Sequence, residues 1–275
     1  MSNFIIKSIG GLLNTASYFS ASYASNKALQ LFATPRKGRY DEAQTAIVAP
    51  AEKLTYTYDN LNITVYNWKG SGKTVFLAHG WESNASRWSY LLDTLKEKDY
   101  NIYAIDAPVH GMSDGKEFNA LLYSECINSV AKIIQPEVII GHSVGGMATT
   151  FCLHNHDLPS VKKIALLGAP AHFTGVFSRY KSMMGYNKRI SEGLDTIVVN
   201  RFGKTVDYFS AANFTKEFNM QGLIIHDKND KIIPYEDALL YKENFKNSEL
   251  ITTEGFGHGL KDQSLSPKII EFIDS

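Results

Sequence analysis

The stretch Val138-Ile139-Ile140-Gly141-His142-Ser143-Val144-Gly145-Gly146 decides the fold of this chain. It begins as a short apolar strand, reaches a Gly-x-Ser-x-Gly turn and continues into residues 147–153, which permit a helix. A serine on such a sharp strand-to-helix turn is a nucleophile elbow, which holds its hydroxyl clear of the sheet. Gly141 and Gly145 remove Cβ atoms that would collide where strand and helix approach each other. The stretch therefore predicts Ser143 as a nucleophile.

Composition narrows the class of protein. The 275 residues are 44% hydrophobic and 20% charged, as in ordinary globular domains. Lysine and arginine equal aspartate and glutamate at 28 each, so no basic surface for nucleic acid is predicted. Cys126 and Cys152 lie in apolar, helix-like runs, which favours free buried thiols over a disulfide. No Cys/His spacing resembles a zinc site, and we expect a cytoplasmic protein without metal or organic cofactor.

Strand and helix patterns alternate along most of the chain. An antiparallel hairpin is expected first, at residues 53–58 and 62–68. The further expected strands are residues 74–78, 101–105, 138–140, 163–167, 223–226 and 250–253. The expected helices are residues 86–98, 121–134, 235–245 and 267–273. This alternation predicts an α/β fold with a mostly parallel, eight-stranded sheet that helices cover on both faces.

Residues 171–219 break the alternation, because a simple crossover between strands would need far fewer residues. The segment is rich in phenylalanine and tyrosine, and we interpret it as a small helical lid. Most of its aromatic side chains are explained by packing. Phe173 and Phe177 are predicted to line an apolar substrate pocket.

The N-terminal residues 1–40 carry an apolar stripe and then a basic linker. The members of the stripe recur every three or four residues, as in an amphipathic helix: Ile5, Ile9, Leu12, Ala16, Phe19 and Tyr23. Three interpretations of residues 4–34 remain open. The helix packs on its own domain or on another subunit, it lies at a membrane surface, or it is a cleaved signal. The basic stretch Arg36-Lys37-Gly38-Arg39 that follows supports the membrane-surface interpretation.

A serine nucleophile needs a base, and the base needs a group that orients it. His258 follows the last expected strand in Gly255-Phe256-Gly257-His258-Gly259, whose glycines let the loop approach the elbow. Asp230 lies in the turn after the strand at residues 223–226, where side chains reach the active edge of a parallel sheet. Asp227 lies three residues earlier and is an alternative acid.

Four motifs in this order resemble the α/β-hydrolase fold family, of the lid-bearing esterase or lipase type. They are His79-Gly80-Trp81, Asp106-Ala107-Pro108-Val109-His110-Gly111-Met112-Ser113, Gly141-His142-Ser143-Val144-Gly145 and the acid loop of residues 226–234. Val109 and Asp227 stand where the family usually has glycine. The resemblance covers residues 53–275 and implies that the backbone N–H groups of Trp81 and Val144 form an oxyanion hole. His79, His110 and His142 are expected to shape loops, and Glu82 is either a substrate contact or a solvent-facing charge.

The predicted organisation is an N-terminal helix and linker (residues 1–40), an α/β-hydrolase core (41–170 and 220–275) and a lid (171–219). The resemblance implies a serine hydrolase that cleaves carboxylic esters or thioesters of a small acyl substrate. Ser143 would form the acyl-enzyme, with His258 as base and Asp230 as orienting acid. Lyase, C–C hydrolase, perhydrolase or acyltransferase chemistry on the same triad is an alternative, as is a ligand-binding protein without catalysis. Residues 4–34 would provide membrane contact or self-association.

Overall fold

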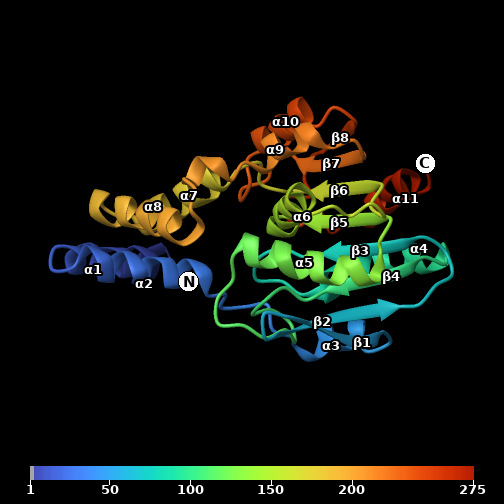
Figure 1. Cartoon of the computed structure of the whole chain (residues 1–275), viewed down its shortest axis with the longest axis horizontal. Coiled ribbons are helices and arrows are strands. Elements are labelled where there is room, and N and C mark those ends of the chain that lie inside the picture. The colour runs from blue at the N-terminus through green and yellow to red at the C-terminus, as the bar shows by residue number, and fades with distance from the viewer. Residues whose placement is uncertain (1–2) are drawn as a thin grey trace. The chain divides into compact units, whose positions relative to one another are not determined.

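The computed structural model describes residues 3–275, which form two compact units (Figure 1). The core unit consists of Pro35–Ala171 and Ala211–Ser275. The cap unit consists of Met1–Thr34 and His172–Ser210. The N-terminal segment and the inserted segment thus belong to one unit, whereas the sequence suggested two separate parts.

The core unit is built on one eight-stranded sheet with strand order β1-β2-β4-β3-β5-β6-β7-β8. Its strands are β1 (Glu52–Tyr58), β2 (Leu61–Trp68), β3 (Thr74–Ala78), β4 (Asn101–Ile105), β5 (Val138–His142), β6 (Lys163–Leu167), β7 (Gln221–Asp227) and β8 (Ser248–Thr253). The pairs β1–β2 and β2–β4 are antiparallel, and the other pairs are parallel. The predicted α/β fold with a mostly parallel sheet is confirmed.

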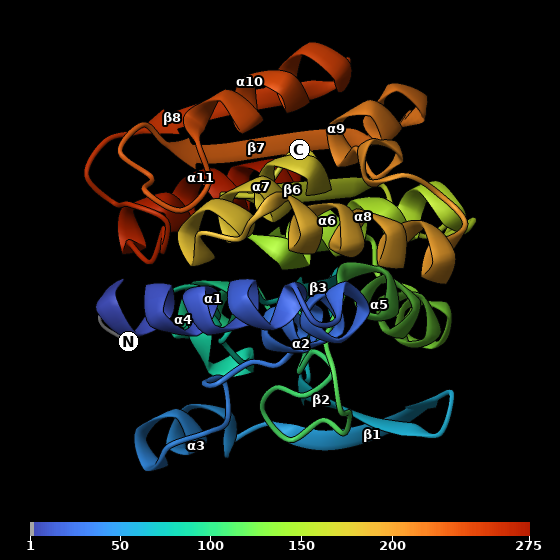
Figure 2. The same ribbon diagram turned by 90° about the vertical axis from the view of Figure 1, so that its left-hand side faces the viewer.

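Helices cover both faces of this sheet (Figure 2). They are α3 (Glu42–Val48), α4 (Ser89–Glu97), α5 (Ala120–Ile134), α6 (Val144–Asn155), α9 (Ala211–Phe214), α10 (Tyr235–Asn244) and α11 (Ser266–Asp274), with 3₁₀ turns η1 (Ala85–Trp88), η3 (Thr215–Glu217) and η4 (Gln263–Leu265). One core cluster joins the sheet to α4 and α11 and contains Trp88, which is fully buried. The second cluster lies under α5 and α6 and contains the free thiols of Cys126 and Cys152. Alternate residues of β3 and β5 enter opposite clusters, as the pleat of a buried strand requires.

Two local features of the core unit follow from turn and cap chemistry. Asp59 and Asn60 have φ values of 44° and 64°, so the β1–β2 hairpin closes through two left-handed residues, as in a type I′ turn. Helix α3 is absent from the sequence-based expectations. The helix begins with a capping box, in which Asp41 accepts from the Gln44 backbone N–H and the Gln44 side chain bonds back to the Asp41 backbone. The sequence signal for it is an aspartate followed three residues later by a glutamine.

The cap unit contains α1 (Asn3–Ser17), α2 (Ala21–Ala33), α7 (Phe173–Met184), α8 (Lys188–Phe202) and the 3₁₀ turn η2 (Val206–Tyr208). The expected single N-terminal helix is instead two helices, because the chain turns at residues 18–20 and Ser20 caps α2. Helix α2 packs along α8, and α1 contacts α7. The apolar stripe does not form the packed face, since Leu12 and Phe19 are 73% and 90% exposed. Among residues 3–275, no helix is long and apolar enough to cross a membrane.

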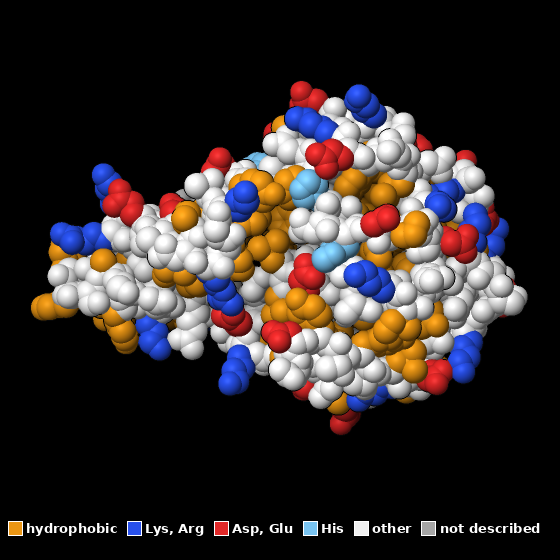
Figure 3. All heavy atoms as spheres, viewed as in Figure 1, with side chains coloured by type: hydrophobic (Ala, Val, Ile, Leu, Met, Phe, Trp, Pro, Cys, Tyr) orange, Lys and Arg blue, Asp and Glu red, His pale blue; other side chains and the backbone are white. Residues whose placement is uncertain are grey.

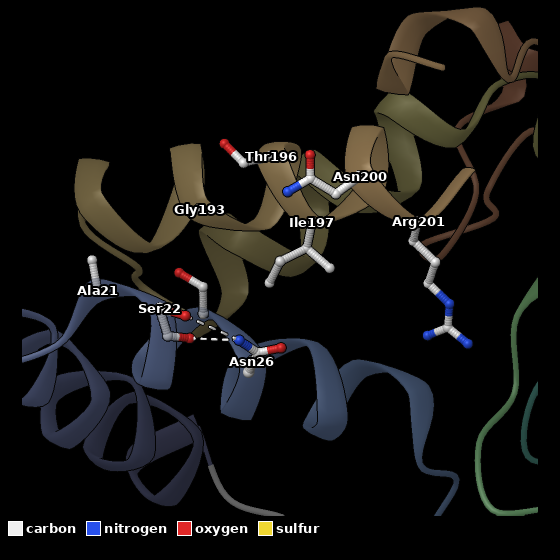
Figure 4. Close-up of a pocket in the computed structure, with 9 residues that line it drawn as sticks. Ala21, Ser22, Asn26, Gly193, Thr196, Ile197, Asn200 and Arg201 are labelled. Atoms are coloured by element: carbon white, nitrogen blue, oxygen red, sulfur yellow. Dashed lines mark hydrogen bonds between the residues drawn. The ribbon is translucent and has the colours of Figure 1, made fainter. Parts of the chain in front are cut away.

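Small residues allow α2 and α8 to approach each other closely. A Cβ added at Gly193 would lie 2.1 Å from the Ser25 hydroxyl, so a larger side chain at residue 193 would separate the helices. Beside this contact runs a groove of about 530 Å³ (Figure 4). Its lining exposes more apolar than polar surface, although polar residues such as Ser22, Asn26, Thr196, Asn200 and Arg201 contribute to it.

Candidate active site

Ser143 occupies the sharp turn between β5 and α6. Its φ of 53° and ψ of −128° form a conformation that non-glycine residues adopt only when the surroundings enforce it. A Cβ added at Gly145 would lie 2.3 Å from the Ala78 carbonyl oxygen, and one at Gly141 would lie 2.5 Å from Gly146 Cα. Both glycines are therefore required by close contact. The side chain of Ser143 is held at the carboxyl end of β5.

The structure brings together the three side chains that the sequence singled out. His258 Nε2 lies 3.0 Å from Ser143 Oγ, and His258 Nδ1 lies 2.7 Å from Asp230 Oδ2. The carboxylate accepts only, so Nδ1 carries the proton and Nε2 accepts from the serine hydroxyl. The Asp230 side chain is fully buried and that of His258 is 20% exposed. This chain of two hydrogen bonds is the arrangement that transfers a proton from a serine to an imidazole.

Asp230 is held as a carboxylate. Burial by itself raises its pKa, but hydrogen bonds from His226, His258 and the Ile233 N–H outweigh burial and lower the pKa below its ordinary value. The Asp230 Oδ1 atom accepts from the backbone N–H groups of Ile232 and Ile233 at 2.8 and 3.0 Å. His226 lies beneath the same carboxylate, with Nε2 3.4 Å from Oδ2. The charge that faces His258 is thereby fixed in position, and sequence reasoning gave His226 no part in this.

Asp227, the alternative acid, points to different partners. Its Oδ2 accepts from Thr253 Oγ1 and from the Phe256 N–H, each at 2.8 Å, and its Oδ1 accepts from the Asn229 N–H. Burial alone raises the pKa of Asp227, but these hydrogen bonds prevail and lower it. Asp227 therefore ties the end of β7 to the loop that carries His258 and makes none of the hydrogen bonds described for the imidazole.

The loop after β3 lies directly against the elbow. A Cβ added at Gly80 would lie 2.8 Å from the Cβ of Ser143, so only glycine fits there without displacement. Trp81 follows and is 36% exposed. Val144 is the first residue of α6, where a helix leaves its backbone N–H groups without intrahelical partners. Of the two residues predicted for the oxyanion hole, Val144 directly follows Ser143 in the chain, and Trp81 follows Gly80, which lies against Ser143.

Three histidines around the site hold loops. His79 donates from Nδ1 to the Gly80 carbonyl oxygen and accepts at Nε2 from the Ala107 N–H. His110 lies against the same loop, and its Nε2 accepts from the Glu82 N–H. Burial lowers the pKa of His110 to about 4. His142 donates from Nε2 to the His258 carbonyl oxygen at 2.8 Å. Neutral imidazoles suit these bonds, because accepting at one nitrogen requires the unprotonated form.

Arg87 also supports the His258 loop, although nothing in its sequence context indicated this. Its buried guanidinium donates to the Gly259 carbonyl oxygen at 2.7 Å and lies 4.6 Å from the Trp88 ring. Burial lowers the pKa of this guanidinium. Together with the bond from His142, the contact fixes two successive backbone carbonyl groups, those of His258 and Gly259.

The predicted pocket residues have other neighbours. Glu82 has a φ of 49°, and its Oε1 accepts from the Arg36 N–H at 2.9 Å. Phe173 and Phe177 stack in the cap unit with ring centroids 4.9 Å apart, and Phe32 lies 5.3 Å from Phe177. Phe177 is 1% exposed, so it packs inside its own unit. A role for Glu82, Phe173 or Phe177 toward substrate stays a prediction.

Two histidines at the C-terminal end of α6 lie beside carboxylates. His156 pairs with Glu125 at 2.8 Å and His154 faces Glu217 at 3.2 Å, so these neighbouring histidines face different carboxylates. Throughout residues 3–275, no group of three histidine, cysteine or acidic side chains is placed to hold a metal ion.

Comparison with known proteins finds relatives among the hydrolases. A sequence profile described as "Serine aminopeptidase, S33" matches residues 70–201. The AB hydrolase superfamily protein YisY of Bacillus subtilis is 22% identical over 252 residues, which cover 75% of this chain and 93% of that protein. The uncharacterized hydrolase YugF of the same species is 26% identical over 266 residues, covering 79% and 96%. An esterase from Exiguobacterium antarcticum has the same fold, with a TM-score of 0.61, 20% identity and coverage of 79% and 97%. The chain therefore has the α/β-hydrolase fold, and its relatives support an enzyme of the hydrolase type from the α/β-hydrolase family of serine hydrolases.

Proposed function

We propose that this enzyme cleaves carboxylic esters or thioesters of small acyl substrates through an acyl-enzyme on Ser143. The observation that carries the proposal is the continuous hydrogen-bonded chain from Ser143 through His258 to Asp230 at a strained elbow. A serine hydroxyl becomes a nucleophile when a base is placed to take its proton as the new bond forms. A strained backbone at the same serine is typical of positions that are organised for function.

Each side chain has one role in the proposed cycle. Ser143 Oγ bonds to the acyl carbon while its proton passes to His258 Nε2. The C–O or C–S bond to the leaving group then breaks, and His258 returns the proton to the departing oxygen or sulfur. Water attacks the acyl-enzyme next, with His258 again taking the proton, and the acid leaves as Ser143 is restored. Asp230 holds the imidazole and stabilises its protonated form.

The negative oxygen of each tetrahedral intermediate needs donors of its own. We assign this role to the backbone N–H groups of Trp81 and Val144. The contact of Gly80 with the Ser143 Cβ and the place of Val144 at the start of α6 support the assignment. One such donor typically contributes about 3 kcal/mol to stabilising the transition state.

The ester class rests on relatives. A pimeloyl-[acyl-carrier protein] methyl ester esterase of Vibrio atlanticus is 29% identical over 107 residues, which cover 38% of that protein. The match covers only part of each chain. The name of this relative supports an acyl ester as the substrate class, and it does not indicate the leaving group.

Turnover of nitrophenyl esters tests the proposal. The wild type should hydrolyse them, and Ser143→Ala should lower kcat by about 10⁶-fold if the chemistry depends on the triad. Ser129→Ala is a matched control, because Ser129 lies on α5 and its hydroxyl bonds only to the Cys126 carbonyl oxygen. A folded Ser143→Ala variant that retains full turnover would refute the acyl-enzyme mechanism.

A further inference from the structure

One face of α1 leaves large apolar side chains in solvent. Phe4 is 81% exposed and Leu12 is 73% exposed. Both lie on the outer side of the helix, since their spacing of eight residues brings them close together around a 3.6-residue period. The turn that follows continues this surface with Tyr18 at 71% and Phe19 at 90% exposure. We call Phe4, Leu12, Tyr18 and Phe19 the apolar ridge. Figure 3 shows hydrophobic side chains at the left-hand end, over the turn between α1 and α2.

The opposite face of α1 contains small residues at its closest contact, which explains why the ridge points outward. A Cβ added at Gly10 would lie 1.8 Å from the Met184 carbonyl oxygen. Gly10 and Ser17 are buried in the cap unit and Ile6, Ile9 and Leu13 are half-buried, so the closest packing of the helix is through its smallest residues. Turning the ridge inward would place large side chains where the backbone of α7 already lies. The exposure is therefore built into the packing of the cap unit.

The end of α1 is also fixed in place. Asn14 donates from Nδ2 to the Gly185 carbonyl oxygen and accepts at Oδ1 from the Asn187 N–H, both at 2.8 Å. Asn187 donates in turn to Ser17 Oγ at 2.9 Å. These bonds join α1 to the turn between α7 and α8, 171 to 173 residues further along the chain. The ridge thus stands on a defined surface and not on a loose terminus.

Charge indicates the kind of partner. The cap unit holds eight basic residues and three acidic ones, a formal charge of +5, although the whole chain is neutral. The three acids are Glu192, Asp195 and Asp207, and the first two pair with Lys188 and Lys181. Residues 1–34 contain Lys7 and Lys27 and no acid. An apolar ridge beside uncompensated positive charge is complementary to a lipid surface that carries anionic headgroups.

The length of α1 decides how this helix would lie in a lipid bilayer. Fifteen residues of α-helix span about 22 Å, less than the roughly 30 Å of a hydrocarbon core. The helix also contains Lys7, Ser8, Asn14 and Thr15. We propose that the cap unit docks on an anionic lipid surface, with α1 in the plane of the interface and the apolar ridge entering the boundary between headgroups and acyl chains. Arg39 of the basic linker donates to the carbonyl oxygens of Gly111 and Ser113, so its guanidinium is engaged inside the core unit.

Co-sedimentation of the full chain with vesicles tests this docking. The protein should sediment with phosphatidylglycerol vesicles, much less with phosphatidylcholine vesicles, and less as salt concentration rises. Leu12→Ser/Phe19→Ser should weaken binding by at least about tenfold, because two large apolar side chains no longer enter the interface. Ile133→Ser/Leu239→Ser is the matched control, since these apolar residues of the core unit are 68% and 48% exposed, and it should bind like the wild type.

Charge reversal separates the electrostatic part. Lys7→Glu/Lys27→Glu should weaken binding to phosphatidylglycerol vesicles by at least about fivefold per residue, whereas the exposed core pair Lys246→Glu/Lys268→Glu should have little effect. Absence of vesicle binding by the wild type at low salt would overturn the proposal. Sedimentation equilibrium of the same proteins gives the other outcome that would overturn it, namely a dimer that Leu12→Ser/Phe19→Ser dissociates, without vesicle binding. Docking does not depend on the proposed hydrolysis, and Ser143→Ala should bind vesicles as the wild type does.

Discussion

Two buried carboxylates three residues apart have different partners at the end of β7. Asp230 contacts the imidazole of His258, whereas Asp227 accepts from Thr253, the last residue of β8, and from the Phe256 N–H beyond it. The sequence favoured Asp230 but could not exclude Asp227, because both follow the strand and both carry the same group. The decision depends on where a turn points each side chain. Hydrogen bonds of Asp230 to Ile232 and Ile233 set that direction, and they form only in the folded chain.

Asp230→Asn should lower kcat for nitrophenyl esters by about four orders of magnitude while leaving the fold intact. The neutral amide keeps the shape of the side chain but no longer holds the imidazole in the required tautomer. The measurement is steady-state turnover, with circular dichroism to establish folding. A loss of less than tenfold would show that another group orients His258.

Asp227→Asn should mainly lower stability, because Asp227 accepts hydrogen bonds that join β7 to the His258 loop. Its pKa is lowered in the folded protein, so the carboxylate stabilises the fold above the ordinary aspartate pKa of about 4 and this contribution disappears as pH falls further. The difference in unfolding free energy between wild type and variant, measured in urea, should therefore be constant at neutral pH and shrink in acid. A difference that grows in acid would contradict this assignment.

At the scale of elements, α1 shows how helix packing can run against apolar patterning. The stripe of Ile5, Leu12 and Phe19 was compatible with a packed face or with a membrane surface, and these side chains are exposed. The fully buried residues of α1 are Gly10 and Ser17, which carry little signal in a hydrophobic pattern. By contrast, β3 was predicted with the bounds observed, because a short apolar run between turn residues is a local signal. Contacts that join residues about 170 positions apart, such as Asn14 to Asn187, have no such local signal.

Neighbouring glycines on α1 give a matched pair for this packing. Gly10→Ala should destabilise the protein, because its Cβ would meet the Met184 carbonyl oxygen. Gly11→Ala should stabilise it by up to about 1 kcal/mol, because no atom lies within 4 Å of the added Cβ and alanine favours a helix. Thermal unfolding of both variants measures the difference. Equal effects of the two substitutions would contradict the position of α1 against α7.

At the scale of the whole molecule, the candidate catalytic residues and the excess of positive charge lie in different units. The candidate triad lies entirely in the core unit, and the excess of basic residues lies in the cap unit. The sequence motifs predicted the fold and the residues that meet at Ser143, because each motif carries its own local requirement for glycine, serine or histidine. The supporting contacts of Arg87 and His226 could not be predicted, since each depends on a distant backbone carbonyl or on the folded acid loop. For His142 the sequence predicted a role in shaping a loop, but not its bond to the His258 carbonyl oxygen.

The central claim is that Ser143 is a nucleophile that His258 activates. A fluorophosphonate probe followed by peptide mass spectrometry tests it most directly, because the probe bonds covalently to an activated serine. The account predicts one adduct, on the peptide that contains Ser143, and its loss in Ser143→Ala and strong reduction in His258→Ala. A folded wild-type protein that stays unlabelled, or that carries the adduct on another residue, would contradict it.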